Sequence, residues 1–267
     1  MAADPSENVE SFCRNWDGAA PYARATIVRT EGATAAKAGA KAIVTAEGEL
    51  IGWLGGGCLR GAVLRAAQQA IKSGRPKLIR VRPKEQVSAD SDADGVELYP
   101  SSCPSKGSSE VFIEPVLPKP KMIIIGASYV AKALADLAPM LGFEPIPMAN
   151  TQGSHHPTLP LGALDQYPAT GRAFIVVATQ GAGDYAVLKA AMATSAPYVA
   201  FVGSLAKVKA MRAGLLEEGA AESALVRLHA PAGLDIGSET PAEIAVAILA
   251  EIISFRRARI GEAPHDC

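Results

Sequence analysis

MIIIGASYVA, residues 122–131, joins a continuous apolar run to a glycine turn and the start of a helical pattern. An uninterrupted apolar run of this length predicts a strand that is buried on both faces of a parallel sheet. Gly126, Ser128 and Ala131 then occupy the three small-residue positions of the dinucleotide-binding pattern G-x-G-x-x-G/A, with serine in place of the second glycine. The stretch therefore predicts the first strand, turn and helix of a Rossmann-like fold.

The chain after this stretch alternates between strand and helix patterns, which predicts a doubly wound parallel sheet over residues 121–267. Further strands are expected at Glu144–Met148, Phe174–Ala178, Tyr198–Val202 and Val226–His229. Helices are expected up to about Leu141, over Tyr185–Thr194, after Ser204 and over Pro241–Arg256 with Thr240 as its cap.

The chain before this stretch has a different pattern, which predicts a mixed α+β domain over residues 1–117. A helix over residues 6–17 capped by Ser6 is followed by short β-rich runs and one long amphipathic helix, Leu59–Ser73. The strands are expected at Tyr22–Thr30, Lys41–Ala46, Leu50–Trp53, Lys77–Arg82, Val96–Tyr99 and Glu110–Val116. The segment Leu117-Pro118-Lys119-Pro120 reads as a linker, because its two prolines disfavour both helix and central strand.

Composition excludes several classes of protein. The 267 residues are 49% apolar and 20% charged with a formal net charge of −1, and neither half is basic, so a nucleic-acid partner is not expected. No apolar run reaches the roughly eighteen residues of a membrane span. The acidic, polar N-terminus has neither the basic start nor the apolar core of a signal peptide, so we expect none. We expect a cytoplasmic protein whose Cys13, Cys58, Cys103 and Cys267 are reduced thiols without a metal site.

The run Gly55-Gly56-Gly57-Cys58 lies between a predicted strand and a predicted helix. Three glycines can present successive N–H groups to an anion, and the helix dipole favours the thiolate of a cysteine at the N-terminus. The alternative interpretation is a tight turn with a buried structural cysteine.

A second cysteine motif, Cys103-Pro104-Ser105-Lys106-Gly107, forms a polar turn between two strands. Lys106 would favour the thiolate of Cys103, although a loop with an incidental cysteine explains the pattern as well. Whether Cys58 and Cys103 lie within disulfide distance is not readable from the sequence.

Other polar positions admit two interpretations each. The strand Glu144–Met148 is followed by Ala149-Asn150, without the carboxylate that binds a ribose in dinucleotide sites. The C-terminal half therefore either binds NAD(P) or keeps the fold without holding it. Gly203-Ser204 follows a buried strand, as loops at the ligand edge of such sheets do. Arg80, Arg82 and Lys84 alternate on a strand and at its end, where an anionic ligand could face them, but the pattern predicts a solvated strand face.

Several of these pieces together resemble the XdhC/CoxI family. The glycine–cysteine run with its flanks and the segment Pro231–Ile252 are the most specific parts, and the matching stretches follow one another in the expected order. They are Ala23–Val63, Cys103–Val116, Ile123–Leu134, Tyr198–Val208 and Pro231–Ile252.

The resemblance implies an accessory factor for xanthine dehydrogenase, carbon monoxide dehydrogenase and related molybdenum hydroxylases. Such factors bind the molybdenum cofactor, which is molybdopterin or its dinucleotide form, support its sulfuration and deliver it to the catalytic subunit of the hydroxylase. A cysteine desulfurase supplies the sulfur, and members are typically homodimers. The resemblance implies that the two cysteine motifs contact the cofactor, that the glycine run holds its phosphate end and that the Rossmann-type half forms a second site. It implies no catalytic residue and no metal ligand. The expected cofactor-binding residues are Gly55, Gly56, Gly57, Cys58, Cys103, Gly126, Ser128, Ala131, Gly203 and Ser204.

The sequence departs from the common pattern of that family at a few positions. Gly55 replaces a serine, Arg60 replaces a glutamate, and Gln180 replaces the histidine of a Thr-His pair. These departures and the missing ribose carboxylate most affect nicotinamide binding. The alternative function is an NAD(P)-dependent oxidoreductase that uses the Rossmann-like half.

Overall fold

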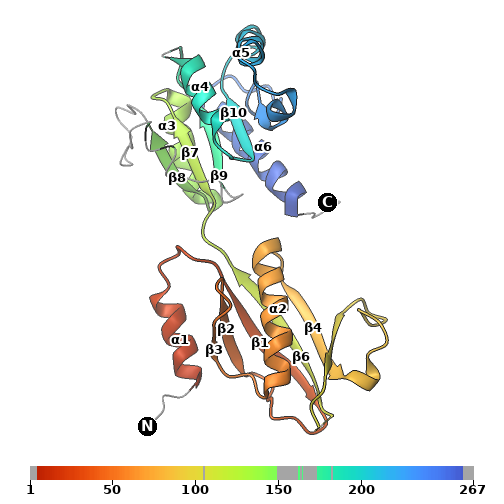
Figure 1. Ribbon diagram of the computed structural model, residues 1–267. Helices are drawn as coiled ribbons and strands as arrows, with labels where there is room; N and C mark the ends of the chain where they lie inside the picture. Colours follow the sequence, from red (N-terminus) through yellow and green to blue (C-terminus); the bar gives the residue numbers. More distant parts are fainter. Residues whose placement is uncertain are drawn as a thin grey trace. The chain divides into compact units, whose positions relative to one another are not determined.

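A computed structural model of the chain describes residues 5–104, 106–148, 162, 164, 173–181 and 183–260, apart from the side chains of residues 5, 6, 58, 259 and 260. The chain divides into two units, Met1–Pro118 and Lys119–Cys267 (Figure 1). The division falls within the predicted linker, and each unit has its own hydrophobic core.

In the described part of the N-terminal unit, six strands form one sheet in the order β3-β2-β1-β6-β4-β5 (Figure 1). Neighbouring strands are antiparallel except β4 and β5, which are parallel. The strands are Tyr22–Glu31 (β1), Lys41–Thr45 (β2), Leu50–Gly52 (β3), Lys77–Pro83 (β4), Glu97–Ser101 (β5) and Ser108–Val116 (β6). The strand positions agree with the sequence prediction to within two residues at each end.

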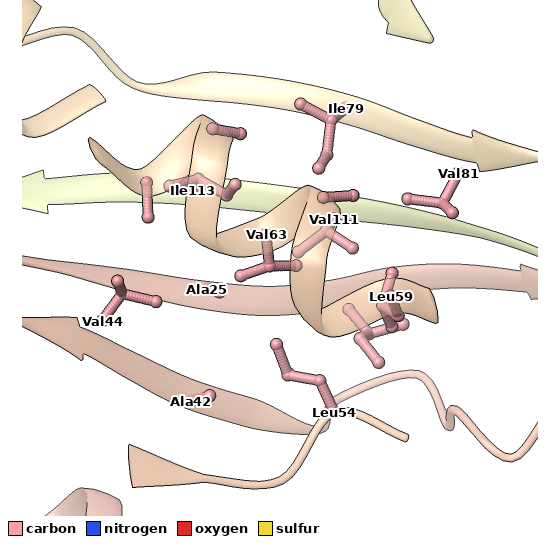
Figure 2. Packing of buried hydrophobic residues seen from close by; sticks show 14 of the residues in the cluster. Ala25, Ala42, Val44, Leu54, Leu59, Val63, Ile79, Val81, Val111 and Ile113 are labelled. Atoms are coloured by element: carbon pink, nitrogen blue, oxygen red, sulfur yellow. The ribbon is translucent and has the colours of Figure 1, made fainter. Parts of the chain in front are cut away.

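The helix α2 (Gly57–Ser73) covers one face of this sheet (Figure 1). Val63 packs between Ala25 of β1 and the pair Val111 and Ile113 of β6 (Figure 2). The helix also presents four fully or almost fully buried alanines to the sheet, which lets its backbone lie close to the strands. It begins two residues before the predicted start, so the last glycine of the glycine run is already helical.

The helix α1 (Pro5–Asn15) covers part of the opposite face of the sheet. Phe12 and Trp16 contact the ring of Tyr22 edge-on, with centroid distances of 5.2 and 5.3 Å. The prediction that Ser6 caps this helix was wrong, because the helix begins at Pro5 and Ser6 lies in its first turn. Proline suits that first position because its missing N–H would have no partner inside the helix.

Arg80 on β4 is part of a charge network rather than of a solvated strand face. Its side chain is 17% exposed and forms ion pairs with Asp92, with Glu110 at 2.8 Å and with Asp94 at 3.3 Å. Burial alone would raise the pKa of Asp92, but the N–H of Val96 and the Arg80 guanidinium together lower it. The network fixes the segment before β5 onto β4, and the predicted solvated face was therefore wrong for this residue.

The strands that the structure describes in the C-terminal unit form one parallel sheet in the order β11-β10-β9-β7-β8 (Figure 1). Its central strands β7, β9 and β10 are almost entirely buried, as the apolar runs predict. The bounds are Lys121–Ile125 (β7), Glu144–Met148 (β8), Ala173–Val177 (β9), Tyr198–Phe201 (β10) and Leu228–His229 (β11). β11 is shorter than predicted because a 3-10 helix, Glu222–Arg227, precedes it.

Helices cover both faces of this sheet, so the predicted doubly wound α/β fold is confirmed. The helices α3 (Tyr129–Leu137) and α6 (Pro241–Ile260) pack on one face. The helices α4 (Asp184–Ala193) and α5 (Leu205–Glu217) pack on the other. The strand order reverses at β7, which has β8 on one side and β9 on the other, and ligands of such sheets bind at this switch point.

The helix α6 starts with a reciprocal capping arrangement. The hydroxyl of Thr240 accepts a hydrogen bond from the N–H of Glu243 (3.3 Å), and the Glu243 carboxylate accepts one from the N–H of Thr240 (2.8 Å). The predicted cap is confirmed. Among the residues that the structure describes, no helix combines the length and the apolarity needed to cross a membrane.

Candidate functional site

The glycine–cysteine run forms the start of α2. Gly55 has φ +112°, and a β-carbon there would lie 2.9 Å from the backbone nitrogen of Ala36, so only glycine fits. Gly56 is the N-cap and has no side chain to cap the helix, while β-carbons at Gly56 and Gly57 would meet open space. No side chain therefore caps the first N–H groups of α2, and the N–H of Leu59 donates to the carbonyl of Gly56 (3.2 Å). Cys58 is the second residue of the helix, and its side chain is outside the described part of the chain.

The second cysteine motif forms a turn after β5. The N–H of Cys103 donates to the hydroxyl of Ser101 (3.2 Å), and the N–H of Lys106 donates to the carbonyl of Cys103 (3.1 Å). Lys106 has φ +52°, which non-glycine residues adopt rarely and most often in turns or functional sites. Cys103 is half-buried.

The segment Ala33–Ala36 lies between the two motifs. Ala33 forms a β-bridge with Lys106, and a β-carbon at Gly107 would lie 2.4 Å from the carbonyl oxygen of Ala33. At its other end the same segment contacts Gly55. Three residues of extended chain span roughly 10 Å, so the two motifs lie at one end of the N-terminal sheet. We call residues 33–36, 55–58, 103, 104, 106 and 107 together the cysteine end.

The sequence predicted the two motifs but not the segment that joins them. Ala33–Ala36 carries no charged side chain, and its hydroxyl, on Thr34, accepts a hydrogen bond from the N–H of Ala36 (3.1 Å). The only available signal was the richness of this loop in small residues, which allow two backbones to approach closely.

Replacing Gly107 with alanine is expected to separate the backbones at the cysteine end. The new β-carbon would press on the Ala33 carbonyl, and relief of such overlap costs roughly 1–3 kcal/mol of the free energy of unfolding. Calorimetry of the full chain measures this loss. The control is Gly61→Ala inside α2, where the nearest side-chain atom is 3.7 Å away and helix propensity favours alanine. Equal stability of the two variants would contradict the contact.

At the switch point of the C-terminal sheet, Gly126 fills a packing role. Its N–H donates to the carbonyl of Met148 on β8 (3.1 Å), and its φ is +129°. A β-carbon there would lie 2.3 Å from the carbonyl oxygen of Ala178, just after β9. The glycine therefore permits β7 to turn against the end of β9, as the first glycine of the dinucleotide pattern is expected to do.

Ser128 uses its side chain within the fold. Its hydroxyl accepts a hydrogen bond from the N–H of Ala131 (3.0 Å), and the residue is 4% exposed. Ala131 is fully buried against the sheet, as predicted from its small size. Because the chain itself satisfies the N–H that would face a pyrophosphate, these residues fit NAD(P) poorly. Met148 at the end of β8 is not an acid either, and Ala149 and Asn150 lie outside the described residues.

The remaining predicted pair, Gly203 and Ser204, connects β10 to α5. A β-carbon at Gly203 would run into the ring of Phe201 at 2.6 Å, so glycine is needed for packing. The hydroxyl of Ser204 caps α5 by accepting from the N–H of Lys207 (3.4 Å), and Ser204 is exposed.

Asp184, at the start of α4, is a buried acid that the sequence analysis missed. It is 4% exposed, accepts a hydrogen bond from the N–H of Gly181 (2.9 Å) and contacts the hydroxyl of Thr179 and the ammonium of Lys207. Burial would raise the pKa of Asp184, but Lys207, Thr179 and Gly181 together lower it. It ties the ends of β9 and β10 together. An acid in the first turn after a buried strand was the available signal.

Comparisons with known proteins extend over both units. The model described as the XdhC Rossmann domain matches residues 122–252, and the model described as the XdhC and CoxI family matches residues 16–82. The uncharacterised protein YqeB of Escherichia coli (strain K12) is 32% identical over 248 residues, which are 88% of this chain and 44% of that protein.

Two further proteins are similar over part or all of the chain. A probable xanthine dehydrogenase subunit of Bacillus subtilis (strain 168) is 27% identical over 164 residues, which are 56% of this chain and 47% of that protein. A crystal structure of a xanthine dehydrogenase from Bacillus halodurans covers 98% of both chains at 18% identity, with a TM-score of 0.46.

The matched regions span less than half the length of both curated relatives. The two family models nevertheless match one unit each, in the order in which the glycine–cysteine helix and the parallel sheet occur in the structure. The chain therefore belongs to the XdhC and CoxI family.

Proposed function

We propose that this protein is an accessory factor that binds the molybdenum cofactor, supports its sulfuration and delivers it to a molybdenum hydroxylase of the xanthine dehydrogenase or carbon monoxide dehydrogenase type. The observation that carries the proposal is the cysteine end, where the segment Ala33–Ala36 contacts both cysteine motifs. Membership of the XdhC and CoxI family supports it, as does the similarity to a probable subunit of xanthine dehydrogenase.

The residues at the cysteine end fit a phosphorylated, sulfur-containing cofactor. Gly56 and Gly57 border open space, α2 has no side-chain cap, and its first turn contains no acid that would repel a phosphate. In this proposal the first N–H groups of α2 hold the phosphate end, and the thiols of Cys58 and Cys103 contact the sulfur-bearing end. The bound cofactor would supply the molybdenum centre that its client enzyme uses.

The partners and location follow from the same proposal. A cysteine desulfurase donates the sulfur, the catalytic subunit of the hydroxylase receives the cofactor, and the protein acts as a homodimer in the cytoplasm. In the C-terminal unit, Gly126, Ser128, Ala131, Gly203 and Ser204 would belong to a second, separate nucleotide-like site at the ligand edge of the sheet, although Ser128 and Ala131 are buried. Of these, Ser204 is an exposed residue whose hydroxyl is near that edge.

Cofactor binding with the wild type, Cys58→Ala and Cys103→Ala tests the proposal directly. We expect the wild type to retain stoichiometric molybdenum after ultrafiltration with intact cofactor, and each variant to bind at least about tenfold more weakly, which corresponds to the loss of about 1.4 kcal/mol of binding energy. Molybdenum analysis of the retained protein gives the readout.

Cys13→Ala is the matched control, because Cys13 lies on α1, where its sulfur is 3.9 Å from the Tyr22 hydroxyl. Serine variants at positions 58 and 103 replace any alanine variant that does not fold. Absence of molybdenum on the wild type, or equal retention by all the cysteine variants, would rule out the proposed role of the two thiols.

A further inference from the structure

Trp53 is an exposed aromatic residue beside the cysteine end. It lies between β3 and Gly55, is 47% exposed, and forms no hydrogen bond or ring contact with another residue that the structure describes. At most about 11 Å separates its α-carbon from that of Gly56, because only three peptide units join them. The described residues of the cysteine end carry no aromatic ring of their own, so Trp53 provides a flat apolar surface at their border.

Other aromatic rings of the N-terminal unit have partners within the fold. Trp16, the second of the two tryptophans in the chain, contacts the ring of Tyr22 edge-on, and its indole N–H donates to the carbonyl of Ala20 (2.7 Å). Tyr99 is 7% exposed and lies under the guanidinium of Arg65. By contrast, the exposed half of the tryptophan next to the cysteine end leaves roughly 100 Å² of apolar surface in water.

Packing fixes the backbone on both sides of Trp53. Before it, Gly52 has φ +99°, and a β-carbon there would lie 2.6 Å from the side chain of Val9 and 2.8 Å from the carbonyl oxygen of Lys41. After it, Leu54 is 4% exposed and belongs to the core beneath α2 (Figure 2). The fold therefore presents the indole to solvent from a defined position, with little ordering left for a ligand to impose.

The surroundings of Trp53 favour a small flat ligand over a protein partner. Tryptophan is enriched in protein interfaces, but there it is surrounded by further buried apolar side chains. The described residues of the cysteine end are instead small or polar. A lone exposed indole beside small residues fits a single planar ring, because every fused heteroaromatic ring has a face on which an indole can stack.

We infer that Trp53 stacks on the pterin ring of the cofactor and selects ligands that contain a flat fused heteroaromatic ring. In this arrangement the indole holds the ring while the two cysteine motifs contact the sulfur-bearing end. The inference rests on the proposed function for the identity of the ligand. The stacking contact itself requires neither the sulfur nor the molybdenum, so it can be measured without them.

Equilibrium dialysis of the full chain with neopterin monophosphate tests the stacking contact, because this probe has the pterin ring and a phosphate but neither sulfur nor metal. We expect Trp53→Ala to weaken binding about tenfold or more, and Trp53→Phe, which keeps a flat ring, to stay within about threefold of the wild type. Phe112→Ala is the control, because Phe112 is 39% exposed in the middle of β6, and it should bind the probe as the wild type does.

Tryptophan fluorescence gives a second readout, which a purely structural role of the residue would not change. Trp16→Phe leaves the emission of Trp53 alone, and Trp53→Phe leaves that of Trp16 alone, because the chain has two tryptophans. We expect the probe to quench the emission of Trp53 more strongly than that of Trp16. Thermal unfolding of Trp53→Ala at the wild-type temperature shows that the loss of binding is not a loss of folding.

The outcomes separate this inference from the proposed function. Equal binding of the probe by the wild type and Trp53→Ala, or equal quenching of the two tryptophans, would overturn the stacking contact. If the wild type does not bind the probe, molybdenum retention with intact cofactor decides, and equal retention by Trp53→Ala again overturns it. Either result alongside cysteine-dependent molybdenum binding removes only the pterin contact and leaves the proposed function. A changed oligomeric state of Trp53→Ala with unchanged probe binding would assign the ring to a protein interface instead.

Discussion

Gly126→Ala is expected to destabilise the C-terminal unit by about 3 kcal/mol or more, because it combines backbone strain with overlap. The β-carbon would lie 2.3 Å from the oxygen and 2.6 Å from the carbon of the Ala178 carbonyl, and 2.9 Å from the α-carbon of Thr179. All three are backbone atoms next to β9, so a change of side-chain conformation cannot relieve the overlap. The φ of +129° is also one that alanine rarely adopts.

Gly142→Ala separates the effect of backbone strain from the effect of overlap. Gly142 has φ +78°, and a β-carbon there would meet nothing within 4 Å, so only the cost of a left-handed alanine remains, roughly 1–2 kcal/mol. Calorimetry of the full chain, in which the transition of each unit is followed, gives both values. If the two variants lose equal stability, the contact between Gly126 and the end of β9 does not limit the substitution.

The sheet of the C-terminal unit could be predicted because burial on both faces leaves a direct trace in the sequence. Ile123, Ile124 and Ile125 are all fully buried, and a strand of this kind has no polar face to interrupt the run. Where a second local structure competes, prediction is less accurate. Val226 was assigned to the last strand, but the 3-10 helix Glu222–Arg227 includes it and leaves only Leu228–His229 for β11.

Residues that interact over long sequence separations were beyond the reach of local patterns. Arg80 looked like one of several alternating charges on a strand, yet its partners lie 12, 14 and 30 residues further along the chain. Asp184 is likewise fixed by Lys207, on the following helix. Periodicity records the distance of a side chain from the core but not the identity of its neighbour.

The sequence predicted the two motifs of the candidate site, but not that they lie close together. Gly55–Gly57 and the turn after Cys103 stand out because glycine and proline interrupt helices and strands and so mark turns and loops. Their proximity depends on Ala33–Ala36, whose alanines have no polar or charged side chain that would indicate a site. In the C-terminal unit the pattern around Ser128 predicted a phosphate site, whereas the hydroxyl of that serine already accepts from the N–H of Ala131.

Glu251→Ala is expected to cost the C-terminal unit about 2–4 kcal/mol, because it leaves several buried donors without an acceptor. The Glu251 carboxylate accepts from the hydroxyl of Tyr198 (2.8 Å) and the N–H of Gly233 (2.8 Å), and lies 2.9 Å from Nδ1 of His229. Tyr198 is fully buried, and its ring stacks on His229 at a centroid distance of 4.1 Å. Burial, together with the Glu251 charge, raises the pKa of Tyr198, so its hydroxyl stays protonated and needs the acceptor.

Glu251→Gln keeps the shape of the side chain and shows how much of this effect requires charge. The amide oxygen can accept from Tyr198 and Gly233, and the amide NH₂ can donate to a neutral His229, so the expected loss at neutral pH is about 1 kcal/mol. Chemical unfolding of the full chain at pH 7 gives the comparison. Glutamine as damaging as alanine would mean that the hydrogen bonds at this position do not contribute the stability assigned to them.

The pH dependence of the stability of the wild type and of Glu251→Gln tests the role of the charge. Burial would raise the pKa of Glu251, but the contacts with His229, Gly233 and Tyr198 outweigh burial and lower it. A carboxylate with a lowered pKa stabilises the fold above its unfolded-state pKa, about 4.3 for glutamate, and this stabilisation disappears as the pH falls through the folded-state value. The advantage of the wild type over Glu251→Gln should therefore be present at pH 7, begin to fall near the unfolded-state pKa of about 4.3, and disappear once the pH is below the folded-state pKa. The amide of Glu251→Gln does not titrate between pH 7 and pH 3, so a charge effect must change the difference in the free energy of unfolding between the two proteins. A difference that stays constant over this range would mean that Glu251 acts through its shape alone.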